Sequence, residues 1–195
     1  MDTCAWRNLQ AVATTHRVFQ LRVSLEDTDP EVWRRILVPG AARLATLHLV
    51  LQGAMGWTDS HLHRFEVEGA TYGMDTEDWD DDDATDETEV TVSEVLHGRR
   101  CALYEYDFGD SWRHEVVVEK EWPVRLGLKH AVCLGGENAC PPEDVGGAPG
   151  YAGFLAAVAD PAHREHDVLL EWAGGAFDPN AFDLATANAV LQRVR

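Results

Sequence analysis

Two stretches near the start of the chain alternate between apolar and polar residues. Residues 17–25 (RVFQLRVSL) and 32–38 (VWRRILV) carry Val, Leu, Ile or Phe at nearly every second position, which predicts two strands. A Pro-Gly pair ending at Gly40 stops the second strand. The short polar turn between the two predicts a hairpin, with Arg34 on the face opposite to that of its two neighbours.

The pattern then changes to a helical one. Leu44, Leu47, Leu51 and Met55 follow one another at spacings of three and four, which places them on one face of a helix. Gly56 after them is a typical C-terminal stop. This helix in the first half of the chain therefore offers an apolar face for packing against strands.

Strand patterns return and then give way to helices. Residues 61–68 alternate, and residues 100–108 and 112–122 predict a second hairpin. Residues 125–150 contain six glycines and three prolines, which predicts little regular structure. A loop of this length is typically functional or packed as a lid. From residue 151 onward the pattern predicts three helical segments.

The order of elements is strands, a helix, strands and then helices, which indicates an α+β fold rather than regular βαβ alternation. We expect a single domain with an antiparallel sheet built from hairpins. The sheet would pack against the helix of the first half and the helices of the C-terminal part. Residues 1–15 are expected to form a flexible arm, residues 16–195 the domain, and residues 75–89 a solvated acidic loop within it.

Charge narrows the classes of partner. The chain has 195 residues and a formal net charge of −18, and ten acids lie between Asp75 and Glu89. Without those ten acids the net charge is still −8, so duplex nucleic acid would be repelled unless a local basic patch exists. A protein or small-molecule ligand is therefore the expected partner.

The sequence contains neither a membrane-spanning pattern nor an export signal. No run of about 18 apolar residues occurs, and the first residues lack a basic stretch followed by an unbroken apolar one. We therefore expect a cytoplasmic protein without a membrane partner. Its cysteines default to free thiols, with a metal clip formed by Cys133, Cys140 and His130 as the alternative.

At the tip of the second hairpin, the turn residues and the apolar pattern predict different loop lengths. A two-residue turn at Gly109 and Asp110 would mix charged and apolar side chains on both faces. A loop with an odd number of residues pairs Asp107 with Arg113 and gathers the aromatic residues on one face. We favour the odd loop, with the two aspartates shaping the turn. Binding of a ligand by these aspartates is the alternative.

Aromatic and acidic residues around this tip form a candidate ligand surface. It combines the tip, the segment GWTDSHLH and the Gly/Pro-rich loop 133–151. Tryptophans at the ends of elements can anchor ligands or partners, and they can equally pack a loop onto a sheet. The candidate ligand-binding residues are Trp57, Asp107, Asp110, Trp112 and Arg113.

Histidines supply an alternative site for a divalent metal. If His61, His63 and His114 share a face with an aspartate such as Asp110, the group could bind a metal ion and support a hydrolase-like reaction. The simpler interpretation is that each histidine is a hydrogen-bonded residue of the core. The sequence leaves both interpretations open.

The sequence contains no complete catalytic motif of a known enzyme class. The letters DFG at Asp107–Gly109 occur without the other kinase motifs, and neither a P-loop nor a GxSxG sequence is present. The sequence therefore favours a binding or accessory module over an enzyme.

Several long motifs resemble one known family. They are PEVWRRILVPG, LHLVLQGAMGWTDSHLHRF, YEYDFGDSWRHEV, CPPEDVGGAPGY, DPAHREHD and EWAGGAFDPNAFD, and they extend in this order over nearly the whole chain. Together they resemble the Ri-plasmid ORF-three-like family, whose members are also described as insertion-sequence passenger or resolvase-like proteins. The resemblance implies a single α+β domain associated with mobile elements, with no established activity and no catalytic residues to transfer.

A resolvase-like role in DNA finds little support in the residues. A serine recombinase needs an activated serine among several arginines and a basic DNA-binding segment. This chain offers only Ser111 near Arg113, and it is strongly acidic. The DNA role therefore ranks below the binding module and the metal-dependent enzyme.

Overall fold

The computed structural model describes residues 17–74, 84–123 and 128–194. Within these residues the chain forms one eight-stranded sheet and five helices. The strands are β1 Arg17–Leu25, β2 Trp33–Pro39, β3 His63–Val67, β4 Ala70–Gly73, β5 Thr85–Asp86, β6 Cys101–Tyr106, β7 Trp112–Pro123 and β8 Val132–Glu137. The helices are α2 Leu44–Met55, α3 Val92–Leu96, α4 Gly147–Ala159, α5 His166–Trp172 and α6 Leu184–Leu191.

The sheet has the order β5-β4-β3-β6-β7-β1-β2-β8. Neighbouring strands are antiparallel except β4 and β5, which run parallel over two residue pairs. Both expected hairpins are present, β1 with β2 and β6 with β7. The structure thus has the expected α+β character, with a short parallel pair added at one edge.

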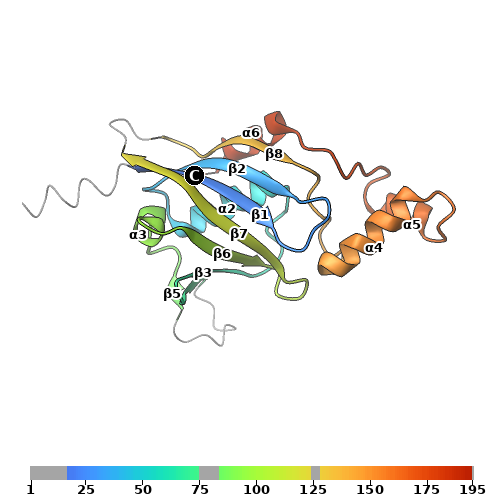
Figure 1. Ribbon diagram of the computed structural model, residues 1–195, viewed down its shortest axis with the longest axis horizontal. Helices are drawn as coiled ribbons and strands as arrows, with labels where there is room; N and C mark the ends of the chain where they lie inside the picture. Colours follow the sequence, from blue (N-terminus) through green and yellow to red (C-terminus); the bar gives the residue numbers. More distant parts are fainter. Residues whose placement is uncertain (1–16, 75–83, 124–127, 195) are drawn as a thin grey trace, which may run out of the picture.

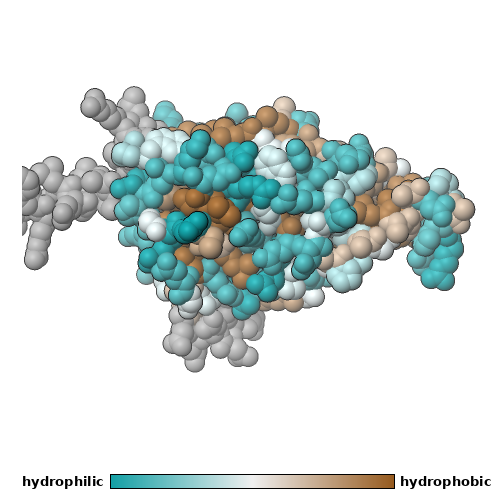
Figure 2. Space-filling view, viewed as in Figure 1, coloured by the Kyte–Doolittle hydropathy of each residue, from teal (hydrophilic) through white to brown (hydrophobic). Residues whose placement is uncertain are grey.

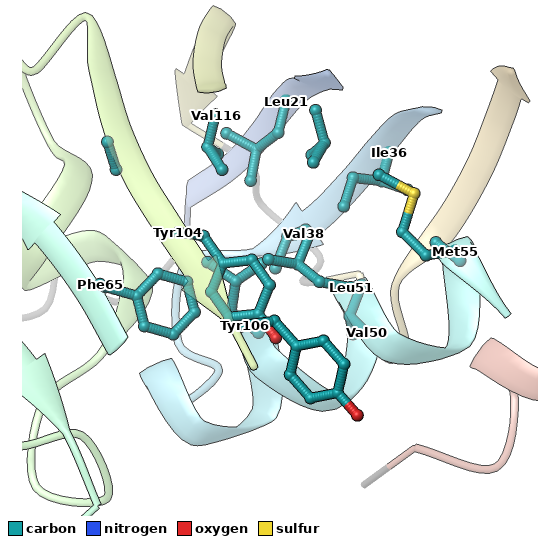
Figure 3. Packing of buried hydrophobic residues seen from close by; sticks show 14 of the residues in the cluster. Leu21, Ile36, Val38, Val50, Leu51, Met55, Phe65, Tyr104, Tyr106 and Val116 are labelled. Carbon is teal, nitrogen blue, oxygen red and sulfur yellow. The ribbon is translucent and has the colours of Figure 1, made fainter. Parts of the chain in front are cut away.

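Helix α2 covers one face of the sheet (Figure 1). Its four predicted stripe residues, Leu44 to Met55, are all buried, and Gly56 ends the helix in a left-handed conformation with φ 105°. Tyr104 and Tyr106 project from β6 into the layer between sheet and helix (Figure 3). Apolar periodicity therefore predicted this layer correctly, because burying the stripe is what holds the helix on the sheet.

The C-terminal helices occupy two places. Helix α6 packs against α2 and β8, whereas α4 and α5 contact each other and extend from one end of the sheet (Figure 1). The other face of the sheet is seen in Figure 2, where hydrophilic side chains lie over most of the strands. Among the described residues, no helix is long and apolar enough to cross a membrane.

Strand β8 lies in the stretch that the glycine and proline content predicted to lack regular structure, so that prediction was wrong. Gly136 pairs with Arg34 of β2, and a Cβ atom at Gly136 would lie 2.7 Å from the Cδ atom of Arg34. The buried Arg34 donates hydrogen bonds to backbone carbonyls of Ala54, Glu137 and Asn138. Glycine is needed here for close packing inside a strand rather than for a turn.

The expected acidic loop is only partly a loop. Residues 75–83 lie outside the described part of the chain, but Thr85 and Asp86 form strand β5. Glu87 is buried, and His63 lies 2.9 Å from its carboxylate. The expectation of a solvated segment therefore fails at Glu87, because a buried imidazole partners its buried carboxylate, whereas Thr85 is exposed although it lies in β5.

The loop at the tip of the second hairpin has five residues, Asp107 to Ser111, because Tyr106 pairs with Trp112. The odd loop was therefore predicted correctly, and the aromatic face formed by Tyr104, Tyr106, Trp112 and His114 is buried. The pairing of Asp107 with Arg113 was wrong, since Arg113 lies opposite Glu105. A register shift of two residues preserves which face each side chain occupies, so the apolar pattern could not exclude it.

Candidate functional site

Two loop segments lie against the tip of the β6–β7 hairpin, which is formed by residues 107–111. They are residues 57–61 after α2 and residues 141–147, which lead into the first turn of α4. The Oδ2 atom of Asp110 accepts a hydrogen bond of 3.0 Å from the backbone N–H of Gly146. Gly147 packs so closely that a Cβ atom there would lie 2.6 Å from the carbonyl oxygen of Asp110. The hairpin tip and the loop before α4 are thus joined by a hydrogen bond and a close backbone contact.

Four side chains at this meeting point, His61, Asp107, Glu143 and Asp144, form what we call the acidic junction. The Nε2 atom of His61 lies 3.2 Å from Asp144 Oδ1, 3.6 Å from Asp107 Oδ2 and 3.9 Å from Glu143 Oε2. This Nε2 atom is buried and makes no hydrogen bond of acceptable geometry. One imidazole nitrogen therefore faces three carboxylates without being bonded to any of them.

The turn holds Asp107 in place. Asp107 has a left-handed backbone with φ 56°, and its Oδ1 atom accepts hydrogen bonds from the backbone N–H groups of Gly109 and Asp110. The prediction that Asp107 shapes the turn is therefore confirmed. Its Oδ2 atom has no hydrogen bond among the described residues and points toward His61, although 10% of the side chain is exposed. The Oδ1 atom of Asp107 thus stabilises the turn, whereas its Oδ2 atom faces His61 in the acidic junction.

Glu143 is held by neighbours from strand β6 and from the loop after α2. Its Oε1 atom accepts hydrogen bonds from the backbone N–H of Thr58 and from the hydroxyl group of Tyr106, which itself accepts from the backbone N–H of Ser60. Burial, with a contribution from the Glu143 charge, raises the pKa of Tyr106 well above its ordinary value. Tyr106 is therefore a neutral hydrogen-bond donor to Glu143 at physiological pH.

Positive charge is scarce at the acidic junction. Within the described residues, no Lys or Arg side chain lies within 4 Å of the carboxylates of Asp107, Glu143 or Asp144. His61 is the only basic side chain paired with them in that part of the chain. The carboxyl oxygens of Asp107 and Asp144 lie within 4.8 Å of each other. The arrangement thus concentrates negative charge that the described residues do not neutralise.

A pocket of about 590 Å³ adjoins the acidic junction and shares Glu143 with it. Trp57 lies in its wall and donates a hydrogen bond of 3.0 Å from Nε1 to the carbonyl oxygen of Pro141. Phe177 and Phe182 from the segment before α6 form apolar parts of its lining, which also includes Arg34 and Asp183. The carboxylate of Glu143 therefore belongs to the lining of a pocket whose walls are largely apolar.

A second cluster lies between α2 and β3. Gln52 Oε1 accepts from the backbone N–H of Asp59, which turns the Gln52 amide so that Nε2 donates to the hydroxyl group of Tyr104. That hydroxyl group then donates to His48 Nδ1 at 2.8 Å, and His48 Nε2 donates to Asp59 Oδ1 at 2.7 Å. The ring of hydrogen bonds is closed and fixes His48 as the neutral Nε2–H tautomer. Burial, with a smaller effect of His63, lowers the pKa of His48 accordingly.

His63 lies flat against His48, with ring centroids 3.4 Å apart and ring planes within 4°. Ligand atoms of His48, Asp59 and His63 lie within 4.8 Å of one another, as a metal site would require. A metal ion, however, binds in the plane of each imidazole ring, and two parallel planes share no point. The stacked pair is therefore arranged for hydrogen bonding and cannot bind one ion without reorientation of the rings.

Comparisons with known proteins identify the family of the chain. A family model described as plasmid pRiA4b ORF-3-like protein matches residues 17–186. The chain belongs to this family. Protein y4hQ of Sinorhizobium fredii (strain NBRC 101917 / NGR234), described as uncharacterized, is 41% identical over 173 residues, which cover 88% of this chain and 86% of that protein.

A solved structure shares the fold. The crystal structure of MM3350, a protein of unknown function from Methanosarcina mazei Go1, has a TM-score of 0.79 and 34% identity, and the match covers 87% of this chain and 97% of that one. The resemblance of the motifs to the plasmid ORF-3-like family is thus confirmed, and the fold it implied is α+β. The association with mobile elements rests on the plasmid in the family's description.

The structure brings only some of the predicted ligand-binding residues of this family member to the acidic junction. Asp107 belongs to it, Asp110 lies beside it and binds the backbone of Gly146, and Trp57 lies in the wall of the adjoining pocket. Trp112 is buried in the aromatic core, where it cannot contact a ligand from solvent. Arg113 lies 3.4 Å from Glu26 on the other face of the hairpin.

The predicted metal ligands are divided among three places. His61 belongs to the acidic junction, and His63 is stacked on His48. His114 is fully buried, donates from Nδ1 to the carbonyl oxygen of Tyr104, and has its pKa lowered to about 4 by burial. Asp110 binds the backbone of Gly146. Among the described residues, neither group of three metal-ligand atoms contains His114, Asp110 or a cysteine.

Sequence reasoning missed Glu143 and Asp144. Both stand in the motif CPPED, directly after two prolines of the Gly/Pro-rich loop. The acids of that loop were the available signal, because paired carboxylates beside prolines in an ordered loop are candidates for binding. The loop itself was predicted to contribute to the ligand surface, and the structure places it against the hairpin tip.

Proposed function

We propose that this protein is a binding module whose ligand surface is the acidic junction together with the adjoining pocket. The ligand carries positive charge, supplied by a metal ion or by a cationic group. The observation that carries this proposal is the meeting of three carboxylates at one imidazole nitrogen without a Lys or Arg partner in the described residues. This function is a more specific form of the binding module that the sequence favours.

Electrostatics support a cationic ligand. Two unit charges of the same sign at the separation of Asp107 and Asp144, up to 4.8 Å, repel each other by about 1–4 kcal/mol near a protein surface. Hydrogen bonds to the backbone hold Asp107 and Glu143 in place, whereas Asp144 is 74% exposed at the side chain. A bound cation would convert the repulsion into attraction, so the site is preorganised for positive charge.

The pocket supports a ligand with an apolar part as well. Its aromatic and aliphatic walls adjoin Glu143, so an apolar body could lie in the pocket while a cationic group reaches the carboxylates. The same charge distribution disfavours nucleic acid. Among the described arginines, Arg35, Arg64 and Arg99 are paired with carboxylates, and Arg34 is buried, so these residues do not form a free basic patch.

Chemical-shift mapping tests this function. ¹⁵N-labelled protein would be titrated at constant ionic strength with zinc chloride, arginine amide and, as an anionic comparison, phosphate. We expect at least one cationic probe to move the backbone signals of residues 58–61, 107–111 and 143–147, and the Glu143→Gln, Asp144→Asn double variant to lose the response. Shifts confined to other regions, or a response to phosphate alone, would contradict the proposed function.

A further inference from the structure

We propose that the acidic junction is a site for one divalent first-row transition-metal ion, with His61 Nε2, Asp107 Oδ2 and Asp144 Oδ1 as ligands and Glu143 beside them. This inference rests on the proposed function, because it names the cation that the ligand surface takes. It also replaces the ligand set that the sequence suggested, since of His61, His63 and His114 only His61 lies at the junction.

The distances around His61 match those between ligands of one ion. Ligand atoms bound at about 2.0–2.2 Å lie about 3.0 Å apart at right angles and about 4.2 Å apart on opposite sides of the metal. The three separations from His61 Nε2 are 3.2, 3.6 and 3.9 Å. A hydrogen-bonded ion pair would be shorter, at about 2.7–2.9 Å. All three distances fit ligands of one ion, and although 3.2 Å alone would allow a hydrogen bond, His61 Nε2 makes none.

Two atoms at the junction are without hydrogen bonds in the described part of the chain, and one of them, His61 Nε2, is fully buried. His61 Nε2 is inaccessible to solvent and unbonded, and Asp107 Oδ2, on a side chain that is only 10% exposed, accepts no hydrogen bond among the described residues. Buried polar atoms in folded proteins nearly always have a partner. The two atoms lie 3.6 Å apart, and an ion between them would bind Asp107 Oδ2 and supply the missing partner to His61 Nε2.

The donor set indicates the class of metal. Calcium and magnesium are bound by oxygen ligands, whereas an imidazole nitrogen favours zinc, iron and the neighbouring first-row ions. One imidazole with two or three carboxylates therefore suits zinc or manganese better than calcium. Asp144 is 74% exposed at the side chain, so the ion would lie at the rim of the junction with room for a further ligand.

The competing cluster is less suited to the same ion. His48, Asp59 and His63 also offer three ligand atoms within 4.8 Å, but the imidazole planes of His48 and His63 lie parallel and 3.4 Å apart. Each of these rings also has a hydrogen-bonded carboxylate already, Asp59 for His48 and Glu87 for His63. The acidic junction combines open geometry with unbonded atoms, which the second cluster does not.

Isothermal titration calorimetry tests the assignment on untagged full-length protein that has been treated with chelator and dialysed. Zinc chloride and manganese chloride are the probes, with calcium chloride for comparison. We expect one zinc or manganese ion per chain in the wild type, with affinity at least tenfold weaker in both Asp144→Asn and His61→Gln. Because Asp144 is exposed and asparagine tolerates its left-handed φ of 58°, the Asp144→Asn variant is expected to fold normally.

Asp27→Asn is the matched control. Asp27 is also an exposed aspartate with φ 58°, and it lies outside the junction, so its replacement should leave the affinity unchanged. Absence of zinc and manganese binding in the wild type, or equal affinity in wild type and both junction variants, overturns the metal assignment. Arginine amide separates the two proposals: if it binds while the metals do not, the cationic ligand surface stands and only the metal fails. If neither binds, both fail.

Discussion

The hydroxyl group of Tyr104 lies 2.8 Å from Nδ1 of His48, and both side chains are buried. The closed ring of hydrogen bonds through Gln52 and Asp59 makes this hydroxyl group the donor. His48 therefore keeps one tautomer, and its ring lies flat on His63. The pair joins α2 to β3, the strand that follows the His61 segment of the acidic junction.

Removal of the Tyr104 hydroxyl group should destabilise the fold. Tyr104→Phe leaves His48 Nδ1 buried without a donor, which costs about 1–3 kcal/mol in the free energy of unfolding. Urea denaturation followed by tryptophan fluorescence measures the change. Tyr72→Phe is the control, because the hydroxyl group of the half-buried Tyr72 has no hydrogen bond among the described residues. Equal midpoints for the two variants would contradict the hydrogen-bonded ring.

The buried His114 should make the free energy of unfolding depend on pH. Burial lowers its pKa from 6.5 to about 4 in the folded protein, so the unfolded chain takes up the proton first as the pH falls. The stabilisation is complete above pH 6.5, is lost between pH 6.5 and pH 4, and amounts to about 3 kcal/mol for this shift. His114→Phe, which cannot be protonated, should lose less stability over that interval than the wild type.

Urea denaturation of both proteins at several pH values between 7.5 and 4 checks this expectation. Subtracting the two curves isolates His114 from the other titrating groups, including His48. Parallel curves for wild type and variant would mean that His114 is not held neutral by burial.

Gly147 should be intolerant of a side chain. A Cβ atom there would lie 2.6 Å from the carbonyl oxygen of Asp110, and the backbone has φ 67°. Gly147→Ala is therefore expected to cost about 1–3 kcal/mol and to weaken cation binding by separating the hairpin tip from Asp144. Thermal unfolding and calorimetric titration of the same preparation measure both effects.

Gly153→Ala provides the comparison for Gly147. Gly153 lies within α4 with open space around it, so alanine should change stability by no more than about 1 kcal/mol and in the favourable direction. A Gly147→Ala variant as stable as Gly153→Ala, with unchanged cation binding, would show that the contact with Asp110 does not position the junction.

Local pattern predicted the layers of the fold well. The stripe from Leu44 to Met55 and the aromatic residues of β6 and β7 are buried as expected, because each depends on the spacing of apolar residues within one element, whereas Phe108 in the loop is exposed. Strand β8 was missed because Gly135 and Gly136 resemble turn residues. The close packing of Gly136 against β2 is decided by the partner strand and is not visible in the local sequence.

The sequence predicted which segments form the candidate site, but it did not predict which side chains contact one another there. Alternation suggested that His61 and His63 point the same way, but β3 begins at His63, so the two-residue period does not extend to His61. His63 instead meets His48 and Glu87, which are distant in sequence. Such partners are fixed by tertiary packing, whereas the meeting of the hairpin tip with the CPPED loop was expected from their shared chemistry.

Anomalous diffraction at the zinc edge, from crystals of the untagged protein grown with zinc chloride, would locate a metal ion at the acidic junction. We expect one strong anomalous peak at about 2.0–2.2 Å from His61 Nε2 and from the carboxyl oxygens of Asp107 and Asp144. A map without a peak at the acidic junction, or with its only peak beside His48 and His63, would contradict the metal assignment.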